Sequence, residues 1–143
     1  MSHSFTIPNE LKSLIDSGVW PNRENVIRQN LKSLVPRELI HRFAEDENYL
    51  YLSAPPFRTV ADYAIGNDFW ATHAAPDEID FEMSLVIGDF GIGSDTAIIL
   101  NYEKDIDAPN VQRLKWGSDP DVQNHWVEIA PNFAQFATML ALG

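Results

Sequence analysis

The chain has 143 residues and a formal net charge of -11, from 10 Lys and Arg against 21 Asp and Glu, and it contains no cysteine. This length predicts a single domain over residues 1–143. The lack of cysteine excludes a disulfide scaffold, thiolate metal sites and a cysteine nucleophile. The negative charge disfavours nucleic acids and anionic membranes as partners, because both are themselves polyanions.

The first third of the chain has the apolar spacing of helices. Leu11, Leu14 and Ile15 recur at helical intervals, and Gly18 follows where a helix can end in the left-handed conformation. Asn22 is the expected cap of a second helix that runs to Pro36, since its apolar residues repeat at the same spacing. A third helix is predicted after Pro36, with one apolar side formed by Leu39, Ile40 and Phe43.

The remainder of the chain is predicted to be mainly strands with a final helix. Aromatic and aliphatic runs separated by turn residues predict strands over residues 49–52, 81–87, 96–102, 111–116 and 126–129. The double proline at residues 55 and 56 ends the first strand. The stretch 59–75 contains a Gly-Asn break, so helical turns are favoured there, although its role is unassigned. Asn132 and Gln135 resemble a capping box before a terminal helix, and the order therefore predicts an α+β fold.

The segment 88–95 is rich in glycine and could be a phosphate-binding loop or a tight hairpin connection. A phosphate-binding loop normally opens a helix, whereas here a β-branched, aliphatic run follows, and Asp89 and Asp95 would repel an anion. A tight hairpin connection is therefore the preferred interpretation. The four histidines are scattered without a metal-binding helix motif, and no serine nucleophile motif is present.

The acidic excess is confined to the second part of the chain. Residues 1–60 carry seven basic and seven acidic side chains, whereas residues 61–143 carry three and fourteen. The carboxylates form two groups in the sequence, at residues 77–82 and 105–107. Neither spacing matches a calcium loop or establishes a glycosidase pair, so a solvated acidic face is the preferred interpretation and a hard-cation site the alternative. The candidate partner-binding residues are Asp77, Glu78, Asp80, Asp89, Asp95, Asp105 and Asp107.

The second part of the chain also resembles a known family. The pattern comprises residues 87–95 and 98–102, Pro109, Val111, residues 114–116, Trp126 and residues 130–136. It is similar to the SUKH superfamily, which includes relatives of a fungal cell-wall-synthesis regulator and bacterial immunity proteins that neutralise secreted toxins, often nucleases. Asn101 stands where the family pattern has an aspartate.

The resemblance implies a largely antiparallel, curved sheet edged by helices, with the C-terminal helix packed on it. It implies no catalytic residue and no cofactor. The motif residues carry structural roles: glycines shape the hairpin, tryptophans pack the sheet, and phenylalanines seat the last helix. These residues are Gly88, Gly91, Gly93, Ser94, Asp95, Trp116, Trp126, Phe133 and Phe136.

The preferred hypothesis is a non-enzymatic immunity-type protein that binds a basic toxin or nuclease through the acidic surface of residues 77–107. An acidic surface steers association with a basic partner and competes for the surface that holds nucleic acid. The alternatives are a regulatory or scaffold adaptor and a small carboxylate-dependent metal-binding enzyme. No targeting segment or membrane helix is evident, so a cytoplasmic location is expected.

Overall fold

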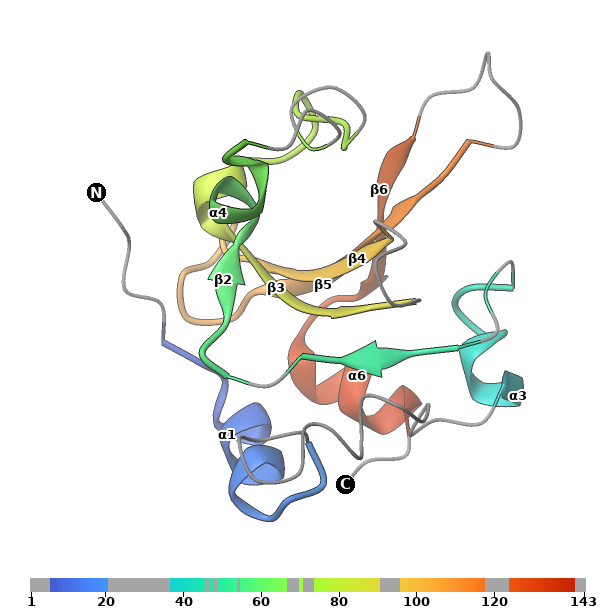
Figure 1. Ribbon diagram of the computed structural model, residues 1–143. Helices are drawn as coiled ribbons and strands as arrows, with labels where there is room; N and C mark the ends of the chain where they lie inside the picture. Colours follow the sequence, from blue (N-terminus) through green and yellow to red (C-terminus); the bar gives the residue numbers. More distant parts are fainter. Residues whose placement is uncertain are drawn as a thin grey trace.

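A six-stranded antiparallel sheet forms the centre of the fold, as seen in the computed structural model in Figure 1. The structure describes residues 6–20, 37–45, 47, 49–53, 55–66, 70, 74–90, 96–117 and 124–140. The strands are β1 (Tyr51–Leu52), β2 (Arg58–Thr59), β3 (Ser84–Asp89), β4 (Ala97–Asn101), β5 (Asn110–Lys115) and β6 (His125–Ala130). Their order is β1-β3-β4-β5-β6, and β2 pairs with β3 as well. Because β4 occupies the other side of β3, β1 and β2 form two pieces of the same sheet edge.

Helices lie on both faces of this sheet (Figure 1). They are α1 (Asn9–Asp16), α3 (Arg37–Ile40), α4 (Val60–Ala64) and α6 (Phe133–Met139), with a short 3-10 turn η1 (Phe81–Met83) before β3. The expected α+β fold with a C-terminal helix on an antiparallel sheet is therefore confirmed. No helix in the described part of the chain is long and apolar enough to cross a membrane.

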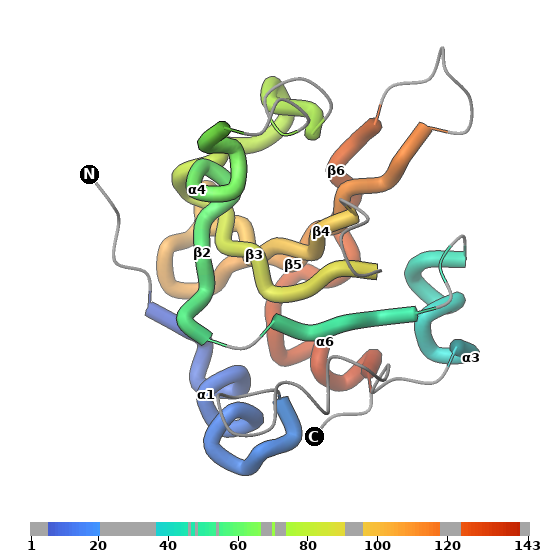
Figure 2. Tube along the Cα trace, viewed as in Figure 1, coloured from blue at the N-terminus to red at the C-terminus, as the bar shows by residue number. Residues whose placement is uncertain are grey.

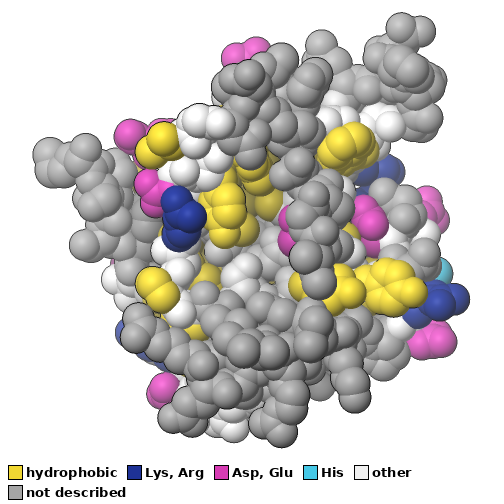
Figure 3. Space-filling model, viewed as in Figure 1, with side chains coloured by type: hydrophobic (Ala, Val, Ile, Leu, Met, Phe, Trp, Pro, Cys, Tyr) yellow, Lys and Arg dark blue, Asp and Glu magenta, His cyan; other side chains and the backbone are white. Residues whose placement is uncertain are grey.

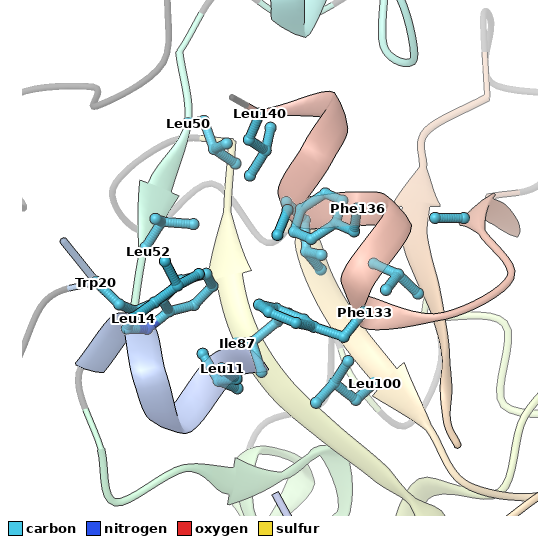
Figure 4. Close-up of a cluster of buried hydrophobic side chains, with 14 of the residues drawn as sticks. Leu11, Leu14, Trp20, Leu50, Leu52, Ile87, Leu100, Phe133, Phe136 and Leu140 are labelled. Atoms are coloured by element: carbon cyan, nitrogen blue, oxygen red, sulfur yellow. The ribbon is translucent and has the colours of Figure 1, made fainter. Parts of the chain in front are cut away.

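The main core lies between the sheet and the helices α1 and α6 (Figure 4). Trp20 stacks edge-on against Phe133, whose ring also meets Phe136 edge-on, and all three side chains are buried. Phe133 and Phe136 thus pack α6 against the sheet within this cluster. Burial of each large aromatic side chain contributes about 2 kcal/mol of hydrophobic free energy, so these rings fix α6 on the sheet.

A second apolar cluster covers the opposite face. It joins Val60 of α4 and Trp70 to Ile99, Leu114 and Trp126 of the sheet. Trp126 is buried, and its indole N–H donates to the carbonyl of Ala74. The sheet is thus covered on both faces, which is why β3 and β4 are almost continuously buried.

The first and last predicted helices agree with the structure. The third, expected to continue through Phe43, ends at Ile40 as α3, because the N–H of Phe43 donates to the carbonyl of Ile40 and closes a tighter turn there. Gly18 ends α1 with a φ of 81°, and Thr59 caps α4 by accepting from the N–H of Asp62. The turns expected within 59–75 thus include α4. The predicted second helix, from Asn22 to Pro36, lies outside the described residues.

Two strand-related predictions need correction. Residues 81–83 form η1 instead of strand, because the Asp80 carboxylate accepts from the N–H of Glu82 and closes a turn there. Gly88 and Asp89, expected in the hairpin connection, are the last two residues of β3.

Gly88 has a packing role within β3. A Cβ atom at this position would lie 2.9 Å from the carbonyl oxygen of Tyr51 in β1. The glycine therefore permits the close pairing of β1 with β3. Gly91, Gly93, Ser94 and Asp95 of the expected hairpin lie outside the described residues.

Candidate functional site

Two acidic segments meet at one end of the sheet. Asp80 caps η1 before β3, and Glu103, Asp105 and Asp107 lie in the connection between β4 and β5. Figure 2 shows this connection on the α4 side of the molecule, near β2. The backbone N–H of Asp80 donates to Oε2 of Glu103 at 3.0 Å, which holds the two segments together.

We call this surface the acidic end and define it as Asp80, Glu82, Glu103, Asp105 and Asp107. All five side chains are exposed. Among the described residues, no ion pair neutralises Asp80, Glu103, Asp105 or Asp107. Lys104 is the single basic residue in the segments 77–82 and 102–108. In the view of Figure 3, acidic side chains lie on several margins of the molecule, one of them beside α4.

Asn101 fixes the position of Glu103. Its side-chain amide donates to Oε2 of Glu103 at 3.0 Å, and its own Oδ1 accepts from the Glu103 N–H at 2.9 Å. The same amide donates to Oε1 of Gln112 at 2.7 Å. Asn101 is buried, and an amide supplies here both a donor and an acceptor, which an ionised aspartate does not. Asn101 therefore orients the Glu103 carboxylate.

The loop that carries Asp105 and Asp107 is locally ordered by hydrogen bonds within the loop. Oδ1 of Asp105 accepts from the N–H of Asp107 at 2.9 Å, and the Asp105 carbonyl accepts from the N–H of Ala108 at 3.3 Å. Such a turn is a typical aspartate structure. Between the two aspartates, Ile106 remains 49% exposed. The loop thus presents one apolar side chain between two carboxylates.

Glu78 lies apart from the acidic end and contacts β6. Its carboxylate accepts from the backbone N–H of Trp126 at 2.8 Å and from the ring of His125. These contacts attach the segment before η1 to the sheet, so Glu78 has a structural role. Asp77 is exposed beside it.

Asp89 does not belong to the acidic end. It lies at the other end of β3, where its carboxylate accepts from the hydroxyl of Thr96 at 2.7 Å, and it is half-buried. Asp95 lies outside the described residues. Of the seven acidic residues selected from the sequence, the structure brings together Asp80, Asp105 and Asp107.

Trp116 differs from its expected role. The resemblance implied that this side chain packs the sheet, but it follows the last residue of β5 and is 47% exposed. One residue beyond the strand, its side chain is no longer held to a face of the sheet by the ladder.

Glu103, Glu82 and Ile106 were not among the candidates. Glu103 follows a predicted strand end directly, and that position is a usable signal, because residues just past a strand form the rim of a sheet. Among the described residues, no group of three or more His, Asp or Glu side chains is arranged to hold a metal ion.

Comparison with known proteins does not assign the chain to a family. No family model, curated protein or solved structure matches it.

Proposed function

We propose that this protein is a non-enzymatic binding domain of the immunity type, which neutralises a basic protein toxin such as a nuclease through its acidic end. The observation that carries the proposal is the hydrogen bond from Asp80 to Glu103, because it joins two acidic segments into one surface. A nuclease is basic where it holds its substrate, so an acidic surface competes for that region.

The charge of the acidic end supports fast association. Carboxylates gathered on one surface attract a basic protein over distances comparable to the Debye length, about 10 Å at 0.1 M salt. Such steering raises the association rate more than it slows dissociation. The exposed Ile106 supplies an apolar contact within the same surface.

The first experiment identifies the partner and its salt dependence. The tagged protein is used to capture partners from its own cells at low and high salt, and mass spectrometry identifies what is retained. A single basic partner in stoichiometric amount, bound more weakly at high salt, is the expected result. Retention of an acidic partner, or of none, would contradict the proposal.

The second experiment tests whether the partner binds at the acidic end. Reversal of two exposed charges, in the double variant Asp105→Lys and Asp107→Lys, is expected to lower the association rate about tenfold at low salt. The matched control is the double variant Glu38→Lys and Glu45→Lys, because both are exposed acids in or just after α3, on another side of the molecule. Equal rates for the double variant and the unmodified protein would exclude this surface.

Inhibition is tested separately from binding. The captured partner is assayed for nuclease activity with increasing amounts of this protein. Loss of activity at equal amounts of the two proteins is expected for an immunity protein. A partner that keeps its activity in the complex would favour an adaptor.

A further inference from the structure

Strand β6 leaves an edge of the sheet open. It is the last strand in the order β1-β3-β4-β5-β6, and no described residue pairs with it as a further strand (Figure 1). In an antiparallel pair, the backbone groups of alternate residues point toward the neighbour and away from it. The side-chain bond from Glu78 to the N–H of Trp126 shows that Trp126 is one of the outward residues.

The register of β5 and β6 then identifies the other outward residue. Leu114 pairs with Trp126, Arg113 with Val127 and Gln112 with Glu128, without an irregularity between them. Glu128 therefore also directs its N–H and carbonyl outward. Of the four outward groups of Trp126 and Glu128, only the Trp126 N–H has a hydrogen-bond partner among the described residues. The other three groups have no hydrogen-bond partner among the described residues, and the Glu128 N–H and carbonyl lie beyond the position that Glu78 occupies beside Trp126.

The side chains next to these groups are accessible on both faces. Val127 is exposed on the face of α6, and Glu128 is exposed on the opposite face, which it shares with Trp126. Asn110 donates to Oε1 of Glu128 at 2.8 Å and holds the carboxylate on that face. The register shift after Glu128 ends the regular pairing, so the open stretch is short.

We infer that β6 accepts an extended, basic segment of the protein partner as an added antiparallel strand. The inference rests on the proposed function for the charge of the partner. A Lys or Arg opposite Glu128 forms a cross-strand ion pair, and a β-branched residue next along the segment packs beside Val127. A second copy of this chain fits less well, because it would bring another net charge of -11 to the same edge.

A synthetic peptide provides the probe. The sequence Lys-Thr-Lys-Val-Lys-Thr-Lys, with blocked ends, alternates basic and β-branched residues and favours an extended conformation. Its matched control carries a backbone methyl group on the nitrogen of every lysine, which keeps the charge but removes the donors that would reach the carbonyls of Trp126 and Glu128. Affinities are measured by NMR titration of the isotopically labelled full chain, and hydrogen exchange reports on the Glu128 amide.

Strand addition predicts three results together. The unmodified peptide binds about tenfold more tightly than the methylated one, since two hydrogen bonds are lost in the control. It also slows exchange of the Glu128 amide and shifts the signals of β6. Equal affinity of the two peptides, or no slowing at Glu128, overturns the inference.

Two protein variants separate the effect of the backbone N–H of residue 128 from the effect of the Glu128 charge. Glu128→Pro removes the outward N–H without removing a ladder bond to β5, and a proline is tolerated at such a position of an edge strand. Glu128→Gln keeps the N–H and removes the charge. Binding of the unmodified peptide is expected to fall about tenfold in the first variant, whereas the second keeps the slowed exchange and loses part of the salt dependence. If Glu128→Pro does not fold, as judged by its NMR spectrum, the two peptides decide the question.

The failure of this inference is distinguishable from failure of the proposed function. If both peptides bind equally and lose affinity with Asp105→Lys and Asp107→Lys, the acidic end binds basic chains without strand addition. If neither peptide binds, the edge is closed, and the capture experiment still tests the acidic end independently.

Discussion

Ile106 is held in an ordered turn by the Asp105 carboxylate, so its exposed side chain is presented at little conformational cost. Truncation in Ile106→Ala is expected to raise the dissociation rate of the captured partner about tenfold, with a smaller effect on association. Ile65→Ala is the matched control, because Ile65 is 80% exposed and lies after α4, outside the acidic end. Equal dissociation rates for the two variants would show that Ile106 is not part of the interface.

Substitution of Gly88 tests how closely β3 packs against β1. In Gly88→Ala the new Cβ would lie 2.9 Å from the carbonyl oxygen of Tyr51, a backbone atom that moves only with β1. Unfolding free energy is expected to fall by about 2 kcal/mol in denaturant titrations. Gly66→Ala is the comparison: its Cβ would meet nothing within 4 Å, and its φ of 70° alone costs about 1 kcal/mol. A smaller loss at Gly88 than at Gly66 would contradict this packing argument.

Tyr102 makes the stability depend on pH in the alkaline range. Burial raises the pKa of the Tyr102 hydroxyl to about 12 from its ordinary value of 10.0, and the hydroxyl donates to the carbonyl of Thr6. The unfolded chain releases this proton near pH 10, whereas the folded protein keeps it until about pH 12. The contribution of the protonated Tyr102 hydroxyl to the unfolding free energy is therefore complete below pH 10. It falls by about 2 kcal/mol as the pH rises toward 12.

The measurement is the unfolding free energy as a function of pH in the unmodified protein and in Tyr102→Phe. Other groups titrate in the same range, so the difference between the two curves is the quantity of interest. This difference is expected to narrow between pH 10 and 12, because the phenylalanine has no proton to lose. Parallel curves over that range would contradict the pKa of Tyr102.

Among the elements, α6 shows how sequence chemistry determines a helix start. The side chain of Asn132 accepts from the N–H of Gln135 at 2.9 Å, and Phe133 and Phe136 then bury the helix on the sheet. Asn132→Ala removes the cap and is expected to cost about 1 kcal/mol of unfolding free energy, whereas Asn132→Asp keeps an acceptor and costs a few tenths. Thermal or denaturant unfolding compares the two variants. An equal loss in both would show that the cap contributes little.

The strands β4, β5 and β6 were predictable within one or two residues. Their apolar runs are bounded by turn residues, and that local pattern is enough to define a strand. The beginning of β3 was not predictable from the sequence. Phe81 and Met83 continue the same apolar pattern, whereas the Asp80 side chain closes a 3-10 turn there. A side-chain cap overrides the strand preference of the residues that it precedes.

The acidic end was only partly predictable for a related reason. Residue types indicated Asp80, Asp105 and Asp107, but the bond from Asp80 to Glu103 joins residues 23 positions apart. Spacing along the chain contains no signal for such a contact, since it depends on how β3 and β4 are aligned. Asp89, by contrast, lies at the far end of β3, where the same alignment separates it from the other acids.

For the whole molecule, the concentration of negative charge in the second part of the chain opposes folding through self-repulsion. Raising ionic strength from about 0.01 M to about 0.1 M shortens the Debye length from about 30 Å to about 10 Å, so the Tm is expected to rise over this range. The double variant Asp105→Lys and Asp107→Lys removes repulsion at the acidic end and is expected to have a smaller salt response than the unmodified protein. The double variant Glu38→Lys and Glu45→Lys changes the same number of charges in the neutral part of the chain and serves as the control for charge reversal in general. A Tm that falls with salt, or an equal reduction of the response in the two variants, would show that repulsion is not concentrated at the acidic end.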